Sequence, residues 1–272
     1  MEDIHSERSK VGVFDSGVGG LSVWRELLKE LPNCNYEYLS DNAYCPYGPR
    51  EQGEIVERVY KAVDFLITKG VSIIVIACNT ATASAIDVLR KNYKIPFIGM
   101  EPAVKPAAIH SKTGVIGVLA TKATLQGRLY NNTLENYASD TLVLEKVGAG
   151  LVEAVESDRT DSPQTRELLR SYIEPMLDAG ADHIVLGCTH YPFLTEEIRK
   201  ITGDKVTIID PAPAVAKHTF LVMLERGLMA DTISTGDSFT NFYSTGETKT
   251  LKKLARSIIP DVKESAFNRI LI

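Results

Sequence analysis

Two apolar runs that each end in a cysteine constrain the fold of this chain more than any other feature. The first reads IIVIACNTAT at residues 73–82, and the second reads HIVLGCTH at residues 183–190. Short apolar runs without polar alternation are typical of strands buried on both faces, as in parallel sheets. A helical pattern follows each run, so both segments predict a strand, a polar turn and a helix.

These runs belong to a longer internal repeat. Residues 11–16 (VGVFDS) match residues 116–121 (IGVLAT), Cys78 matches Cys188, and residues 97–104 resemble residues 208–215. Three segments that recur in the same order at nearly constant spacing indicate two similar halves. We therefore expect an α/β fold of two similar domains, with parallel-type sheets flanked by helices and related by a pseudo-two-fold axis. The expected domains are 1–99 plus 211–272, and 100–210.

Strands and helices also alternate in the rest of the chain. Apolar periodicity predicts strands near 11–14, 35–40, 73–77, 93–100, 113–119, 141–146, 183–187, 206–209 and 238–245. It predicts helices near 21–31, 54–69, 81–92, 125–137, 164–178, 194–202, 215–226 and 251–258. We expect the last helix to close the chain. In the helix at 54–69, the residues expected to face the core are Ile55, Val59, Val63, Leu66 and Ile67.

Composition excludes several classes of protein. The chain has 272 residues, of which 44% are hydrophobic and 24% charged, as in globular proteins rather than disordered or fibrous ones. A net charge of −5 gives no electrostatic reason to expect nucleic-acid binding. No apolar run approaches the ~18 residues of a membrane span, and residues 1–10 form a polar tail without the apolar core of a signal peptide. Four cysteines without close pair spacing indicate a reducing, cytoplasmic setting.

Polar residues follow the predicted strands at their carboxyl ends. Asp15 and Ser16 end the first strand, and Cys78, Thr121 and Cys188 end three others. Ligands of open α/β sheets bind at this edge, so we expect these residues to converge in a cleft between the two halves. The glycine-rich loop at 15–20 has neither a Walker lysine nor the glycine spacing of a dinucleotide fingerprint, so a nucleotide site is not expected.

Two thiols on opposite sides of one carbon suit racemisation or epimerisation. One cysteine removes a proton from one face as a thiolate, while the other delivers a proton to the opposite face. The unperturbed thiol pKa of about 8.5 makes both forms accessible at neutral pH. Each thiol needs a neighbour that manages its proton, and the candidates are Asp15 beside Cys78, with His190 and Glu153 beside Cys188. The candidates for binding an α-carboxylate are Ser16, Asn79, Thr80 and Thr189.

Other interpretations remain open at this point. A cysteine at a strand end is often only a small core residue, and we interpret Cys34 and Cys45 in this way. A zinc site made of Cys78, Cys188 and His190 lacks the usual short spacings of Cys and His ligands. A thiol hydrolase would need one nucleophilic cysteine and a covalent intermediate. A small-ligand binding module with the same cleft would bind its ligand without catalysing a reaction.

Four motifs give the chain a family resemblance. They are GVFDSGVGG at 12–20, PYG at 46–48, ACNTA at 77–81 and GCTHYP at 187–192. With these motifs the chain resembles the glutamate racemases, cofactor-independent members of the aspartate/glutamate racemase superfamily. The resemblance runs from about Val11 to the last predicted helix. Relatives that act on aspartate share the paired cysteines, so the preference for glutamate rests on the flanking motifs.

The resemblance implies an activity and a set of site residues. It implies an isomerase that interconverts L- and D-glutamate without pyridoxal phosphate, metal or nucleotide, and that supplies D-glutamate for peptidoglycan synthesis. It implies that Cys78 abstracts the α-proton of D-glutamate and Cys188 that of L-glutamate, commonly in a homodimer. The implied substrate contacts are Asp15, Ser16, Pro46, Tyr47, Gly48, Asn79, Thr80, Thr121, Thr124, Thr189 and His190.

Overall fold

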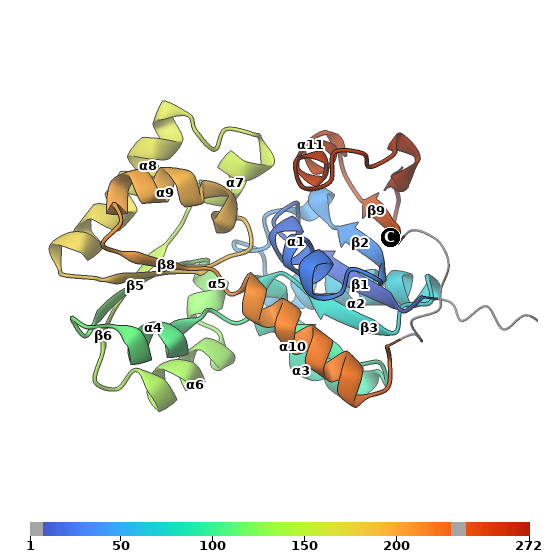
Figure 1. Cartoon of the computed structure of the whole chain (residues 1–272), viewed down its shortest axis with the longest axis horizontal. Coiled ribbons are helices and arrows are strands. Elements are labelled where there is room, and N and C mark those ends of the chain that lie inside the picture. The colour runs from blue at the N-terminus through green and yellow to red at the C-terminus, as the bar shows by residue number, and fades with distance from the viewer. Residues whose placement is uncertain (1–7, 230–237) are drawn as a thin grey trace, which may run out of the picture.

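The computed structural model describes residues 8–229 and 238–272 and has an α/β fold with two sheets. Figure 1 shows the two sheets in separate halves that lie side by side, each flanked by helices. Most of the polar tail expected at residues 1–10 falls outside the described residues. None of the helices in the described parts of the chain is long and apolar enough to cross a membrane.

The first sheet has six strands in the order β10-β9-β2-β1-β3-β4, and all of its neighbouring strands are parallel. Its strands are β1 (Lys10–Asp15), β2 (Asn35–Ser40), β3 (Ile73–Ile76), β4 (Phe97–Gly99), β9 (Thr240–Ser244) and β10 (Phe267–Arg269). Every residue of β2 and β3 is buried, which explains the unbroken apolar run before Cys78.

The second sheet has four parallel strands in the order β6-β5-β7-β8. They are β5 (Val115–Ala120), β6 (Leu142–Val147), β7 (His183–Gly187) and β8 (Thr207–Ile209). This order repeats the order β2-β1-β3-β4 of the first sheet. The internal repeat found in the sequence therefore corresponds to a repeated strand topology, with β1 equivalent to β5 and β3 equivalent to β7.

Helices cover both sheets (Figure 1). In the first half they are α1 (Leu21–Glu30), α2 (Gln52–Thr68), α3 (Asn79–Asn92), α10 (Ala212–Glu225) and α11 (Lys249–Ile258). In the second half they are α4 (Val104–His110), α5 (Lys122–Leu125), α6 (Arg128–Tyr137), α7 (Leu151–Glu156), α8 (Pro163–Asp178) and α9 (Thr195–Thr202). Short 3-10 helices are η1 (Asn42–Tyr44), η2 (Tyr191–Leu194) and η3 (Glu264–Ala266). Helix α10 follows the second sheet and packs on α1, so the chain returns to the first half.

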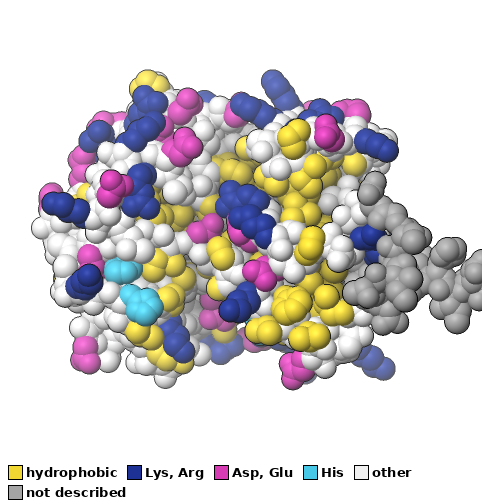
Figure 2. Space-filling view, in the orientation of Figure 1, with side chains coloured by type: hydrophobic (Ala, Val, Ile, Leu, Met, Phe, Trp, Pro, Cys, Tyr) yellow, Lys and Arg dark blue, Asp and Glu magenta, His cyan; other side chains and the backbone are white. Residues whose placement is uncertain are grey.

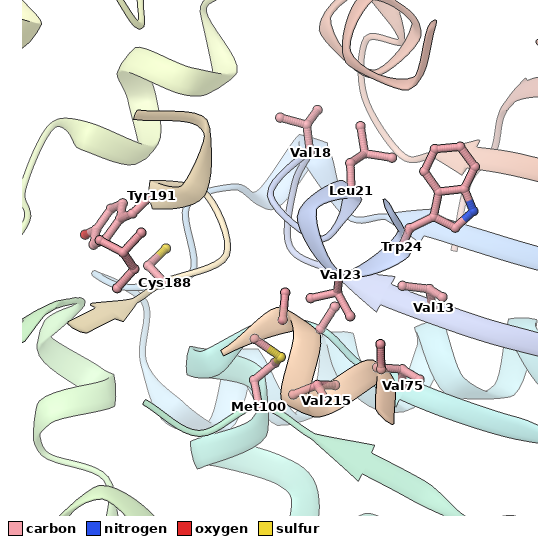
Figure 3. Packing of buried hydrophobic residues seen from close by; sticks show 14 of the residues in the cluster. Val13, Val18, Leu21, Val23, Trp24, Val75, Met100, Cys188, Tyr191 and Val215 are labelled. Atoms are coloured by element: carbon pink, nitrogen blue, oxygen red, sulfur yellow. The ribbon is translucent and has the colours of Figure 1, made fainter. Parts of the chain in front are cut away.

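One cluster of buried side chains extends across both halves. It joins Val13 and Trp24 of the first half to Leu186, Cys188 and Tyr191 of the second. Figure 3 shows Cys188 and Tyr191 on the loop after β7, across from the side chains of α1. Because the halves share buried apolar surface, the loops at their facing edges are held against one another.

The surface carries charges of both signs. Figure 2 shows Lys and Arg side chains mixed with Asp and Glu side chains over the face that it draws. Hydrophobic side chains are also visible on this face. The exposed hydrophobic residues of the described chain include Leu221 and Leu224 of α10.

The structure corrects some of the expected elements. Helix α11 does not close the chain, because η3 and the edge strand β10 follow it. Helices α4 and α7 were not predicted, and the helix expected at 125–137 is divided into α5 and α6. Ile67, expected in the core, is 39% exposed although its neighbour Leu66 is fully buried, because at 100° per residue Ile67 lies at the margin of the helix face that Ile55, Val59, Val63 and Leu66 bury.

Candidate active site

The predicted strand-end residues lie at the facing edges of the two sheets. Asp15 ends β1, Cys78 follows β3 by two residues, Thr121 follows β5 and Cys188 follows β7. Both thiols are buried, with Cys78 5% exposed and Cys188 7% exposed. Their charges interact, because a negative Cys188 contributes to raising the pKa of Cys78. Thr189, which follows Cys188, donates to Asp15 at 3.0 Å, and Cys78 contacts Ser16 at 3.6 Å, so the two cysteine loops meet at this edge as expected.

Cys78 caps the N-terminus of α3 with its sulfur. The N–H of Ala81 donates to Cys78 Sγ at 3.4 Å, and the thiol donates to Ser16 Oγ at 3.6 Å. Burial raises the pKa of Cys78 to about 12, and the Asp15 carboxylate adds to the shift. A helix N-terminus and a hydroxyl group favour the thiolate, so local groups can hold the charge once a proton is transferred.

Cys188 contacts a buried imidazole that is itself paired with a carboxylate. Cys188 Sγ lies 3.7 Å from His190 Nδ1, and His190 Nε2 lies 2.6 Å from Glu156 Oε1. Burial alone would lower the pKa of His190, but hydrogen bonds to Cys188, Cys45 and Glu156 hold it well above its usual value. His190 can therefore carry a proton at neutral pH, directly beside Cys188.

Asp15 is fully buried between the two halves. Its carboxylate accepts hydrogen bonds from the N–H of Gly17 at 2.9 Å and from Thr189 Oγ1 at 3.0 Å. Burial raises the pKa of Asp15, although the charge of His190 and the two hydrogen bonds oppose this effect. Asp15 thus interacts electrostatically with Cys78 on one side and with His190 on the other.

The carboxylate that contacts His190 is that of Glu156, whereas from the sequence we expected Glu153 as a candidate beside Cys188. Glu153 lies on α7 with an exposed side chain, whereas Glu156 is the last residue of α7 and reaches His190. The sequence carries no signal that separates Glu156 from Glu153, because both lie on the same short helix. A carboxylate at a helix C-terminus is stabilised by a positive partner, and in the fold His190 is that partner. Burial would raise the pKa of Glu156, but the hydrogen bond and the charge of His190 lower it.

The glycine-rich loop after β1 lies against these catalytic candidates. A Cβ atom at Gly17 would be 1.9 Å from Glu156 Oε1, and one at Gly19 would be 2.4 Å from His190 Nδ1. Both distances are far shorter than van der Waals contact. Gly17 and Gly19 therefore leave room for side chains of the second half, whereas a Cβ atom at Gly20 would be 2.7 Å from Asp15 Cβ within the first half.

Hydroxyl and amide side chains of both halves lie at the facing edges of the two sheets. Thr80 Oγ1 lies 2.9 Å from Thr121 Oγ1, which lies 2.8 Å from Thr124 Oγ1. Asn79 is buried, and neither polar atom of its side chain has a hydrogen-bond partner among the described residues. A buried amide without partners costs stability, so its presence here is a sign of a polar ligand.

The loop that carries Pro46, Tyr47 and Gly48 is held by a hydrogen bond to Asp41. The Tyr47 hydroxyl donates to Asp41 Oδ2 at 2.6 Å, and the peptide bond before Pro46 is cis. A Cβ atom at Gly48 would lie 3.3 Å from Thr121 Cβ, so this loop also touches the second half. A cavity of about 260 Å³ is lined by residues that include Pro46, Gly48, Thr121 and Glu153.

The zinc site considered from the sequence does not form. In the described parts of the chain, the ligand atoms that lie close enough to share an ion belong to Cys45, Glu156 and His190. Cys78 and Cys188 are not part of this group.

The chain is similar to a set of characterised proteins. Residues 19–219 match the model of the family described as Asp/Glu/Hydantoin racemase. A relative from Roseiflexus sp. named glutamate racemase is 49% identical over 220 residues, which is 80% of this chain and 81% of the relative. The structure of a glutamate racemase from Bacillus anthracis superposes with a TM-score of 0.84 at 31% identity, over 97% of each chain. A glutamate racemase from Escherichia coli, in complex with L-glutamate and the activator UDP-MurNAc-ala, gives a TM-score of 0.83 at 30% identity, over 97% of this chain and 98% of that chain.

Proposed function

This chain belongs to the Asp/Glu/Hydantoin racemase family and is an amino-acid racemase, and we propose that it interconverts L- and D-glutamate with Cys78 and Cys188 as its two bases. The observation that carries the proposal is the pair of buried thiols that follow equivalent strands, each with its own neighbour for handling a proton. Glutamate as the substrate rests on the relatives, which are named for it and one of which is a complex with L-glutamate.

In the direction from D- to L-glutamate, the Cys78 thiolate takes the α-proton and becomes a thiol. The electron pair of the broken C–H bond stays on the α-carbon, and the Cys188 thiol delivers its proton to the opposite face. Cys188 is left as a thiolate, next to the protonated His190 at 3.7 Å. In the reverse direction the two cysteines exchange roles, and solvent protons restore the starting state.

Neighbouring groups keep these charges stable inside a buried site. The N–H of Ala81 and the hydroxyl of Ser16 contact the sulfur of Cys78, while Asp15 interacts with the charge of both Cys78 and His190. His190 is a positioning and proton-holding residue for Cys188, and Glu156 holds its ring through Nε2. Glu156 takes over the role that we had expected for Glu153.

The substrate would lie between the thiols, with its polar groups bound by residues of both halves. The unpaired amide of Asn79 can donate to the α-carboxylate and accept from the α-ammonium group. Hydroxyl groups of Thr80, Thr121, Thr124 and Thr189, with the loop at 46–48, are proposed for the remaining contacts. Both proton transfers use side chains of the protein, so we expect activity without added cofactor or metal.

The resemblance supports several broader proposals. The two domains would be residues 1–99 plus 211–272, and residues 100–210, with the active site between them. The enzyme would act as a homodimer in the cytoplasm and supply D-glutamate for peptidoglycan synthesis.

Proton NMR in D₂O tests the proposed reaction. Purified protein, with chelator and without cofactor, is incubated with D-glutamate. Loss of the α-proton signal in parallel with loss of optical rotation is expected. Exchange with aspartate but not with glutamate would keep the mechanism and contradict the substrate, and exchange with neither amino acid would contradict the proposed function.

A further inference from the structure

We propose that Cys45, Glu156 and His190 form an inhibitory binding site for a thiophilic divalent cation, best represented by zinc. The ligand atoms of these three residues all lie within 4.8 Å of one another. Cys45 Sγ lies 3.5 Å from Glu156 Oε1, and His190 Nε2 lies 2.6 Å from the same oxygen. Thiolate, imidazole and carboxylate together are a ligand set that zinc prefers.

The spacing of the three groups requires little change for coordination. Zinc bonds of about 2.3 Å to sulfur and about 2.0–2.2 Å to nitrogen and oxygen place tetrahedral ligands roughly 3.3–3.6 Å apart. The separation of Cys45 Sγ and Glu156 Oε1 already falls in this range. The hydrogen-bonded pair of His190 and Glu156 would have to open by less than about 1 Å, from 2.6 Å. A water molecule would complete the four ligands.

The carboxylate is held in place by groups outside the three ligands. The N–H of Val18 donates to Glu156 Oε1 at 2.7 Å, and Asn42 Nδ2 donates to Glu156 Oε2 at 2.7 Å. The hydroxyl of Thr250 donates to the main-chain oxygen of Glu156 at 2.8 Å. Such outer contacts orient metal ligands and reduce the cost of assembling a site.

Coordination would exchange one cation for two protons. Glu156 Oε1 now accepts from the thiol of Cys45 and is paired with Nε2 of His190. A divalent cation would displace the thiol proton and the Nε2 proton and form bonds to sulfur, nitrogen and oxygen. The net charge of the cluster is unchanged, so the buried site gains no uncompensated charge.

The cluster has an approach of its own from the surface. A cavity of about 380 Å³ is lined by Asn42, Cys45, Pro46, Glu156 and Thr250, among other residues. Neither Cys78 nor Cys188 lines this cavity. A cation can therefore reach Cys45 and Glu156 without passing between the two thiols that act on the substrate.

Binding of the cation would inhibit racemisation at Cys188, one of the two proposed bases. His190 contacts Cys188 through Nδ1 and would be bound to the cation through Nε2. The imidazole would then be fixed as a metal ligand, and the hydrogen bond between His190 Nε2 and Glu156 Oε1 would be replaced by bonds of both atoms to the cation. This consequence rests on the proposed function, whereas binding of the cation does not.

Binding is measured with cobalt(II) as a spectroscopic substitute for zinc. A thiolate ligand produces a sulfur-to-cobalt charge-transfer band, which is titrated in the wild type, in Cys45→Ser and in the matched control Cys34→Ser. Cys34 is also buried but lies outside the cluster. We expect a band with one equivalent of cobalt in the wild type and in Cys34→Ser. In Cys45→Ser the band should be lost and zinc affinity should fall by more than about 100-fold, because even outer-shell changes cost about 10–100-fold.

Inhibition is measured separately on the same three proteins. Zinc should inhibit racemisation by the wild type and Cys34→Ser reversibly, with recovery on addition of a chelator, and Cys45→Ser should keep its activity in zinc. Absence of the cobalt band in the wild type, or an equal band in Cys45→Ser, would overturn the proposed site. Inhibition that persists in Cys45→Ser would show that zinc acts on Cys78 and Cys188, and would overturn the inhibitory role. Because the cobalt titration needs no turnover, a failure of the proposed racemase activity is distinguishable from a failure of this site.

Discussion

Replacement of Arg58 by methionine should destabilise the protein strongly, because Arg58 forms a buried ion pair. Arg58 Nη2 donates to Asp41 Oδ1 at 2.7 Å and Arg58 Nε donates to Asp41 Oδ2 at 2.9 Å, with side chains only 4% and 0% exposed. Arg58 Nη1 also donates to the main-chain oxygen of Ile272 at 2.8 Å. The guanidinium lies 3.9 Å from the centre of the Tyr44 ring. One side chain thus joins α2, the loop after β2 and the C-terminus.

The expected loss of stability follows from the buried charge of Asp41, which the substitution leaves without a counter-ion. Methionine keeps most of the buried volume of Arg58 but none of its donors. Asp41 then retains hydrogen bonds from Tyr47 and Thr245 while losing its counter-ion in a fully buried position. Removing one partner of a buried ion pair costs about 3–5 kcal/mol. With a urea slope of about 3 kcal/mol per M, the unfolding midpoint should fall by roughly 1–1.7 M.

Urea unfolding followed by circular dichroism tests this value, and Arg170→Met is the matched control. Arg170 pairs with Glu174 at 2.8 Å on α8, but both side chains are about half exposed, at 52% and 50%. Exposed pairs of this kind contribute about 0.3–0.5 kcal/mol. The double variant Arg58→Met/Asp41→Asn should recover part of the lost stability. An Arg58→Met variant no less stable than Arg170→Met would refute the argument.

Two further predictions concern the site loop and the second sheet. Gly17→Ala should reduce kcat at least about tenfold, because a methyl group would lie 1.9 Å from Glu156 Oε1 and displace it from His190. Steady-state kinetics measure this effect. An unchanged kcat would contradict the close approach of Gly17 to Glu156. Burial alone would raise the pKa of Asp182, but hydrogen bonds from His183, Ser111 and the N–H groups of residues 112 and 113 hold it well below its usual value. Since the folded pKa lies below the unfolded one, Asp182 stabilises the fold at neutral pH and this contribution is lost as the pH falls below about 4. Asp182→Asn should lower the free energy of unfolding by about 2 kcal/mol at pH 7 and by progressively less in acid. Urea unfolding of the wild type and the variant at several pH values measures this, and a difference in stability that does not depend on pH would be inconsistent with this interpretation.

The sequence predicts the sheets well because buried parallel strands leave a strong local signal. The runs before Cys78 and Cys188 are apolar on both faces, and their equivalence follows from the repeat. Strand β10 was missed because its three residues, FNR, are partly exposed at an edge and have no apolar run. Ile67 follows the apolar period of α2, but it lies at the margin of the buried face, where Leu66 is fully buried and Ile67 is not.

The contacts between the halves were the least predictable part of the site. The periodicity of α7 identifies its apolar face but does not say which of its two acids reaches His190. Cys45 looked structural because it lacks the context of the other two cysteines, yet it contacts Glu156 across the halves. The glycine-rich loop could be recognised as unusual, whereas the side chains of the opposite half that lie against Gly17 and Gly19 are brought there only in the folded protein.

The most direct test of the account is α-proton exchange in D₂O with wild type, Cys78→Ser and Cys188→Ser. The two-base mechanism predicts that the wild type exchanges the α-proton of both enantiomers of glutamate and converts each into the other. Each variant lacks one of the two bases, so neither should convert one enantiomer into the other at a rate approaching that of the wild type. Racemisation by Cys188→Ser at a rate near that of the wild type would contradict the central claim that the two thiols act from opposite faces of one carbon.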